Sequence, residues 1–203
     1  MVCRCFISAV RFALVFLNTR FGWIAAAYVV VMLSYTFFLK KVVILDVIVI
    51  ASGFVLRAVA GAVVIDVSIS SWLLVCTIFL ALFLGLNKRR HELILLGEDA
   101  TSHRHILKEY SPYLLDQMIS VVTASTVMAY ALYTTAAETV EKFGTRNLIL
   151  TLPFVLYGIF RYLYLVHQKN MGGSPEQIFI KDGAMMLNIV LYLAVVGVIL
   201  YRA

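Results

Sequence analysis

The sequence predicts an all-α protein, a polytopic bundle of about seven transmembrane helices that forms a single domain over residues 1–203. Composition is the first reason. Hydrophobic residues make up 63% of the 203 positions and charged residues only 14%, with a mean hydropathy of +0.96, so the chain has too little polar surface to cover a soluble globule. The second reason is that the apolar residues gather in stretches of roughly the 17 to 25 residues that cross a bilayer.

Seven apolar stretches are the expected spans. In chain order they are residues 6–17, 23–39, 44–65, 71–86, 118–136, 148–166 and 184–201. The first is short and carries Arg11, but it lacks the small-residue cleavage site of a signal peptide, so we interpret it as a membrane helix.

The longest loops lie between these spans on one side, at 88–117 and 167–183. In the first of them, residues 91–96 are expected to continue the preceding helix, and Gly97-Glu98-Asp99 is expected to end it. Ser111-Pro112 has the order of a helix cap followed by proline, which predicts the start of the next helix.

The distribution of Lys and Arg predicts the orientation. If the spans alternate, one side receives most of the loop cations, including Lys40, Lys88 and Lys169. We expect this to be the cytoplasmic side of the cell (plasma) membrane. The net charge of +6 is then mostly a topology signal, and nucleic acid is not an expected partner. The three cysteines have no metal-binding spacing.

Ionisable residues within a span are costly, and stretch 44–65 holds two of them. Asp46 and Arg57 are eleven positions apart, which returns both to one helix face. Gly53 and Gly61 lie four positions either side of Arg57, where a neighbouring backbone or a ligand could come close. Two structural alternatives stay open: Asp46 in the headgroup zone, and Arg57 paired with an acid on another helix.

A dense cluster of polar and charged residues, Asn87 to Leu93, begins where stretch 71–86 ends. Helical continuation would put Lys88 and Arg89 beside Glu92, at spacings of four and three. This cluster is either a solvated helix end held by ion pairs or a phosphate clamp, in which Arg gives a bidentate fork and Lys a point charge. Lys40 would face the same compartment, although a lysine at a span end is normally a topology anchor.

Polar and aromatic side chains recur at helical spacing in stretch 148–166, at Tyr157, Arg161 and Tyr164. They are either an interfacial belt or part of a site that residues 172–176 could cover as a lid.

Several motifs together resemble the UbiA-type membrane prenyltransferases, over nearly the whole chain. The segment from Tyr35 to Lys40, Ile44-Leu45-Asp46 and residues 53–62 are similar to the central helices of that family. A closer similarity, to its phosphoribosyltransferase branch, is carried by residues 88–93, 96–98, 110–111, 114–117, 130–133, 153–158 and 161–167.

The resemblance implies a nine-helix fold and a reaction. A polyprenyl phosphate, such as decaprenyl phosphate, attacks the anomeric carbon of phosphoribosyl diphosphate, and Mg²⁺ neutralises the diphosphate that leaves. The product would be a precursor of a cell-envelope polysaccharide. The partners implied are the two substrates and the bilayer, and a homo-oligomer stays open.

The resemblance also assigns roles to residues. Phosphate groups would contact Lys40, Lys88 and Arg89, with Arg57 and Arg161 as further contacts. The carboxylates would orient these groups or the ribose, and two tyrosines would give support; the residues concerned are Asp46, Glu92, Glu98, Tyr35 and Tyr164.

One departure from the family is large. Its members have two further N-terminal helices joined by an Asn-Asp-x-x-Asp-x-x-x-Asp motif that holds Mg²⁺ and diphosphate, and no such motif occurs in this sequence. The seven spans would match the last seven of nine, with the metal site unknown. We therefore expect a fragment that is inactive alone.

Two alternatives remain open on the sequence. The chain could instead be a polyprenyltransferase whose acceptor is an aromatic acid. A non-enzymatic transporter or assembly protein would show paired intramembrane acids or broken helices, and the spans offer only Asp46 and Pro153.

Overall fold

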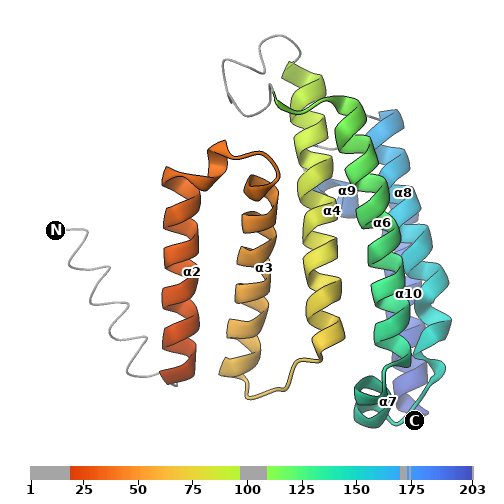
Figure 1. Ribbon diagram of the computed structural model, residues 1–203. Helices are drawn as coiled ribbons and strands as arrows, with labels where there is room; N and C mark the ends of the chain where they lie inside the picture. Colours follow the sequence, from red (N-terminus) through yellow and green to blue (C-terminus); the bar gives the residue numbers. More distant parts are fainter. Residues whose placement is uncertain (1–18, 97–108, 170–172, 174, 203) are drawn as a thin grey trace. The chain divides into compact units, whose positions relative to one another are not determined.

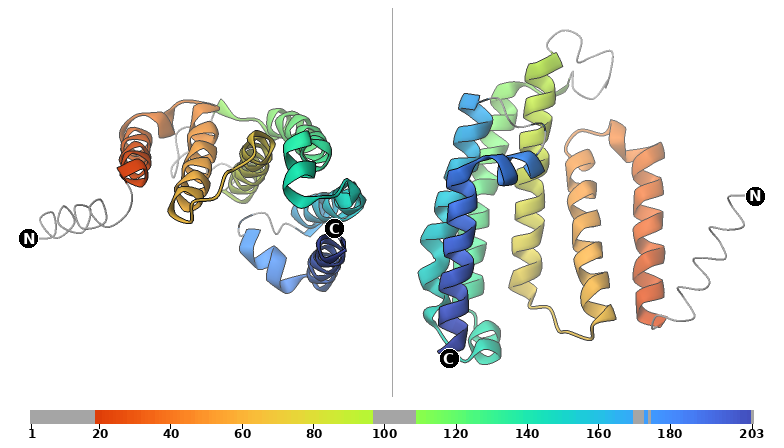
Figure 2. Two further views of the ribbon diagram at one scale, coloured as in Figure 1. Left: turned by 90° about the horizontal axis from the view of Figure 1, so that it is seen from below. Right: turned by 180° about the vertical axis from the view of Figure 1, so that it is seen from behind.

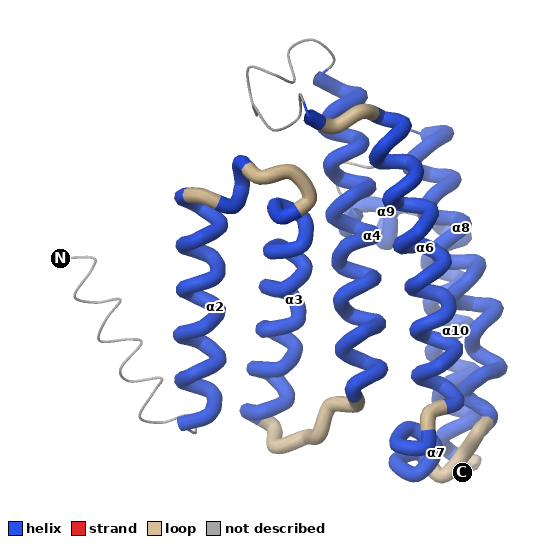
Figure 3. Tube along the Cα trace, in the orientation of Figure 1, coloured by secondary structure: helices blue, strands red, loops and turns tan. Residues whose placement is uncertain are grey.

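The computed structural model describes residues 19–96, 109–169, 173 and 175–202. Within these ranges the chain is helical and contains no strand (Figure 3). Six of the described helical segments are long and apolar enough to cross a membrane: Thr19–Phe37, Leu45–Val64, Ser71–Leu95, Pro112–Thr135, Asn147–Lys169 and Gly183–Tyr201. The predicted polytopic helical class is confirmed. The expected span 6–17 lies outside the described residues.

The chain divides into two compact units, Met1–Ile69 and Ser70–Ala203. The described part of the first unit is a helical hairpin of α2 (Thr19–Phe37), a short 3₁₀ turn (Leu39–Lys41) and α3 (Leu45–Val64), and α2 packs along α3 (Figure 1). The close approach predicted at Gly53 is found there, because a Cβ at Gly53 would lie only 2.6 Å from Cε of Met32 in α2. Gly61 has open space instead.

A tight turn precedes α3. Ile44 has a φ of 69° and a ψ of −45°, and the backbone N–H of Leu45 donates to the carbonyl of Val43 at 2.8 Å. This is a γ-turn, which is a strained conformation for a β-branched residue. The turn redirects the chain so that Asp46 falls in the first turn of α3, where it is buried.

The described part of the second unit contains four long helices. They are α4 (Ser71–Leu96), α6 (Pro112–Thr135), α8 (Leu152–Lys169) and α10 (Gly183–Tyr201), and in sequence order each packs against the next, α4 on α6, α6 on α8 and α8 on α10 (Figure 2). Shorter helices occupy two of the expected loops: α7 (Ala137–Phe143) and α9 (Pro175–Lys181). A 3₁₀ segment, Asn147–Thr151, leads into α8.

Side chains from different helices form the core of this unit. Phe83 of α4 contacts Tyr162 of α8 with ring centroids 5.2 Å apart, and Tyr162 stacks on Phe179 of α9 at 6.2 Å. Leu115 of α6 and Met185 of α10 are also fully buried. The short helix α9 is therefore part of the packed unit.

The helix starts follow local sequence signals. Ser111 caps α6, since its hydroxyl accepts a hydrogen bond from the backbone N–H of Leu114 at 3.1 Å, and Pro112 follows at the first helical position. The predicted cap is confirmed. Helix α4 continues to Leu96, as expected from residues 91–96, whereas Gly97-Glu98-Asp99 lies outside the described residues. Pro153 falls in the first turn of α8, where proline is tolerated.

Candidate active site

The C-terminal turns of α4 carry the cluster that the sequence singled out. Arg89 is buried, and its Nη1 lies 2.6 Å from Oε2 of Glu92, one helical turn away. Of the two pairings expected with Glu92, the one with Arg89 is formed. Lys88 is exposed and makes no ion pair within the described residues. The cluster therefore combines a fixed guanidinium with an available ammonium group.

Gly173, the residue described between α8 and α9, lies close to this cluster. A Cβ at Gly173 would lie 2.8 Å from two ring atoms of His91, which is two positions beyond Arg89 on α4. A side chain at this position would require the imidazole of His91 to move. The expected lid over residues 172–176 stays a prediction. Of these residues the structure describes Gly173, Pro175 and Glu176, and the last two begin α9.

Arg161 belongs to a second ion pair. Its Nε and Nη2 donate to the two carboxylate oxygens of Asp182 at 3.1 and 2.8 Å, and the guanidinium carbon lies 5.2 Å from the centroid of the Tyr164 ring. Asp182 also caps α10, accepting from the backbone N–H of Met185 at 2.8 Å. The hydrogen bonds from Arg161 hold the pKa of the Asp182 carboxyl below its usual range, and burial opposes them.

A third charged group was missed by the sequence analysis. Arg90 donates through Nε and Nη2 to the carboxylate of Asp116 on α6, and Nε2 of His167 on α8 lies 3.4 Å from Oδ1 of the same carboxylate. Nδ1 of His167 lies 2.9 Å from the carbonyl of Leu163. A charged side chain at one end of each of three successive helices is the signal that could have indicated this group.

The first unit holds the other predicted residues. Arg57 is exposed, its Nε donates to the carbonyl of Gly53 at 3.2 Å, and its guanidinium lies 4.3 Å from the centroid of the Phe54 ring. Arg57 has no acidic partner within the described part of the hairpin. The exposed Lys40 lies in the 3₁₀ turn that joins the end of α2, with Tyr35, to the start of α3, with Asp46, whereas Arg57 lies farther along α3. Glu98 lies outside the described residues.

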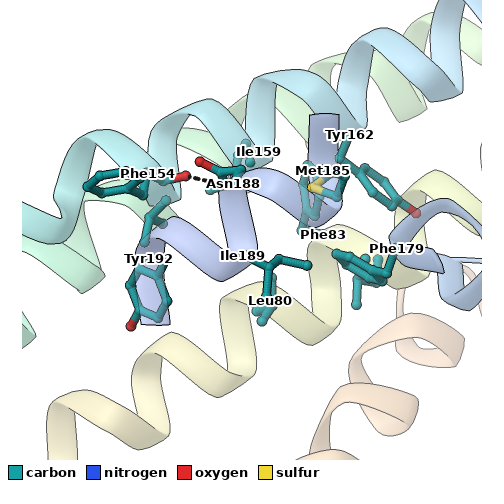
Figure 4. Close-up of a pocket in the computed structure, with 13 residues that line it drawn as sticks. Leu80, Phe83, Phe154, Ile159, Tyr162, Phe179, Met185, Asn188, Ile189 and Tyr192 are labelled. Atoms are coloured by element: carbon teal, nitrogen blue, oxygen red, sulfur yellow. Dashed lines mark hydrogen bonds between the residues drawn. The ribbon is translucent and has the colours of Figure 1, made fainter. Parts of the chain in front are cut away.

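An apolar cavity lies in the second unit between α4, α8, α9 and α10, with a volume of about 210 Å³ (Figure 4). Its walls are apolar except for a few polar tips, and the amide of Asn188 is turned away to donate to the carbonyl of Phe154 at 3.0 Å. Leu80 and Leu84 line the cavity, and Lys88 continues their spacing of four along α4, so the three share one helix face.

The described residues do not suit a metal ion. Within ranges 19–96, 109–169 and 175–202 there is no group of three or more His, Cys, Asp or Glu side chains that could hold one. The carboxylates that contact the cluster, Glu92 and Asp116, are each bound to an arginine.

The fold and the site define a class, a polytopic helical membrane protein with fixed and free cations at the end of an apolar, cavity-lining helix face. Within that class the chain is homologous to proteins named decaprenyl-phosphate phosphoribosyltransferase. It is 27% identical to that of Mycolicibacterium smegmatis over 192 residues, 91% of this chain, and 28% identical to those of Corynebacterium glutamicum and Mycobacterium tuberculosis over 81% and 89% of this chain.

These similarities confirm the resemblance to the phosphoribosyltransferase branch of the UbiA-type proteins. The chain spans 60%, 49% and 59% of the lengths of the same three relatives. No family model matches the chain.

Proposed function

We propose that this protein is a UbiA-type membrane transferase that moves a 5-phosphoribosyl group from phosphoribosyl diphosphate to a polyprenyl phosphate such as decaprenyl phosphate. The names of the relatives that align with most of the chain support this reaction class. The product would serve the synthesis of a cell-envelope polysaccharide. The membrane would be the plasma membrane, with the Lys88 end on the cytoplasmic side, as the distribution of Lys and Arg predicts.

One observation carries the proposal for this chain. The exposed ammonium group of Lys88 stands on the same helix face as Leu80 and Leu84, which line the apolar cavity. An isoprenoid phosphate needs this combination, since its chain favours an apolar surface and its phosphate favours a cation. The prenyl chain would lie along the cavity face of α4 with its phosphate beside Lys88.

The chemistry requires positioned charge more than a strong protein nucleophile. A phosphate oxygen of the lipid forms a bond to the anomeric carbon, and the bond from that carbon to the diphosphate oxygen breaks with both electrons. Negative charge grows on the departing diphosphate. Arg89, held by Glu92, is a donor whose orientation is already fixed, while Lys88 can follow the lipid phosphate.

Lys40, Asp46 and Arg57 stay proposed site residues, with roles in substrate contact that rest on the family resemblance. Mg²⁺ also stays a proposal, and the described carboxylates supply no ligand set for it. Bound with the donor, the ion would offset the charge of the leaving diphosphate.

Membranes from cells that express the intact gene would be assayed with labelled phosphoribosyl diphosphate and polyprenyl phosphate. Lys88→Ala is expected to lower kcat/KM by about 10- to 100-fold, the effect of losing one charge-assisted hydrogen bond, and Lys88→Arg to restore part of it. The matched control is Lys169→Ala, an exposed lysine at the end of α8, which should keep full activity.

The proposal fails if the intact gene gives no labelled lipid, or if Lys88→Ala equals the control. Assaying the 203-residue chain both alone and together with the N-terminal segment of the Mycolicibacterium smegmatis relative tests the expectation of inactivity separately. Robust transfer by the chain alone would contradict that expectation.

A further inference from the structure

A second hollow lies on the second unit, in a groove between α6 and α8 with a volume of about 670 Å³. None of its lining residues is shared with the apolar cavity described above. Most of the lining is apolar, including Val127, Leu156 and Phe160, while Asp116 and His167 lie together at one end. Phe160 is 56% exposed and belongs to a membrane span, so the groove opens toward the lipid.

The polar end of the groove offers both signs of charge. The Asp116 and His167 side chains are 40% and 30% exposed, whereas the Arg90 side chain is 14% exposed. The less exposed Arg90 holds the carboxylate in place by hydrogen bonds. Asp116 can still accept a hydrogen bond on its exposed side, where His167 is its polar neighbour.

A buried hydroxyl lies farther along the groove. Thr123 is 8% exposed and lines the groove, and its Oγ1 has no hydrogen-bond partner within the described residues. Such a group is unfavourable in an apolar setting unless a ligand supplies a partner. Thr123 is seven residues beyond Asp116 on α6, which is about 10 Å along the helix axis.

We propose that this groove binds one molecule of a phospholipid whose headgroup carries a primary ammonium beside its phosphate. The ammonium donates to Asp116, the phosphate lies beside His167, and an ester carbonyl accepts from Thr123. One acyl chain fills the apolar length of the groove. The order of polar groups along such a lipid, with the chain last, matches the order of Asp116, Thr123 and the apolar lining along α6.

The experiment measures lipid retention by native mass spectrometry of the full chain in mild detergent. The chain is first equilibrated with equal amounts of phosphatidylethanolamine, phosphatidylglycerol and phosphatidylcholine. We expect phosphatidylethanolamine to be retained in preference, as one molecule per chain. Asp116→Asn should abolish the preference among the three headgroups.

Two further variants test the groove. Ala124→Phe fills it and is expected to lower retention by about tenfold, and Thr123→Val, which removes only the hydroxyl, by about threefold. Each has a matched control on α6. Val121→Phe is the control for Ala124→Phe, because Val121 is 66% exposed and does not line the groove. Thr126→Val is the control for Thr123→Val, because the Thr126 hydroxyl already donates to the carbonyl of Val122 at 2.7 Å. The thermal unfolding midpoint of each variant shows whether it folds. If Ala124→Phe does not fold, the comparison of Thr123→Val with its control decides whether the groove holds the lipid.

Equal retention of the three phospholipids by the unmodified chain would overturn the proposal. So would retention that Ala124→Phe and Thr123→Val leave at the level of their controls, or a polyprenyl phosphate found in the groove instead.

Discussion

At the scale of single residues, ion pairs determine which donor nitrogens of Arg90 and Arg161 remain for a further ligand. Asp182 occupies Nε and Nη2 of Arg161, which leaves Nη1 for a substrate. Arg90 is committed to Asp116 through the same two nitrogens. Lys88 has no such partner within the described residues, so a phosphate can bind it at less cost than it can bind either of these paired arginines.

Asp182→Asn tests the pair with Arg161. The folded-state pKa of Asp182 is lowered, so its stabilising contribution is complete above the ordinary value of about 3.9 and is lost as pH falls through the lower folded value. At pH 7 the variant should melt a few degrees below the unmodified chain, and the difference should shrink as the pH is lowered below 4. Thermal unfolding in detergent measures this, with the exposed Glu141→Gln as control. A difference independent of pH would contradict the assignment.

Sequence reasoning found these charged residues unequally. The Arg89–Glu92 pair was predicted because both partners lie on one helix, where spacing determines contact. Asp182 is 21 residues from Arg161, and Asp116 is 26 residues from Arg90, each on another element. These pairings depend on how the helices pack, which periodicity within one span does not reveal.

At the scale of elements, the helix starts were readable because capping is local. Ser111-Pro112 was predicted and is observed, whereas α9 was expected as part of a loop because its seven residues are too few for a clear periodic pattern. The predicted spacing of Asp46, Gly53 and Arg57 on α3 holds, but the two glycines differ: Gly53 faces Met32 of α2, and Gly61 faces open space.

The hairpin of the first unit should respond differently to the same change at these two glycines. Gly53→Leu must displace Met32 and part of α2, and we expect it to destabilise the hairpin by about 1–3 kcal/mol. Gly61→Leu is the matched control and should cost less than half as much. Gly53→Ala should be mild, because the obstructing atom is the end of a flexible side chain. Unfolding in graded denaturing detergent gives the comparison, and equal effects at both positions would refute this packing.

At the scale of the whole molecule, the described helices confirm a multi-pass membrane protein, while a single domain for the whole chain stays a prediction. Positive charge predicts which side each end faces, and labelling can test it. In a variant with Cys3, Cys5 and Cys76 replaced by serine, a membrane-impermeant maleimide on intact cells should label Glu141→Cys in α7. It should spare Lys169→Cys, at the opposite end of α8, until the cells are opened. The reverse pattern would invert the topology.

The bond between Arg161 and Asp182 also constrains how this protein can diversify. It joins the second half of α8 to the N-cap of α10, so the chain between them, including α9, begins and ends at fixed points. Insertions and deletions in the connection between α8 and α9 can then accumulate without changing the depth at which α10 enters the bilayer. Because α8 and α9 both contribute buried side chains to the core, related chains should differ in length between these two helices more readily than within either of them.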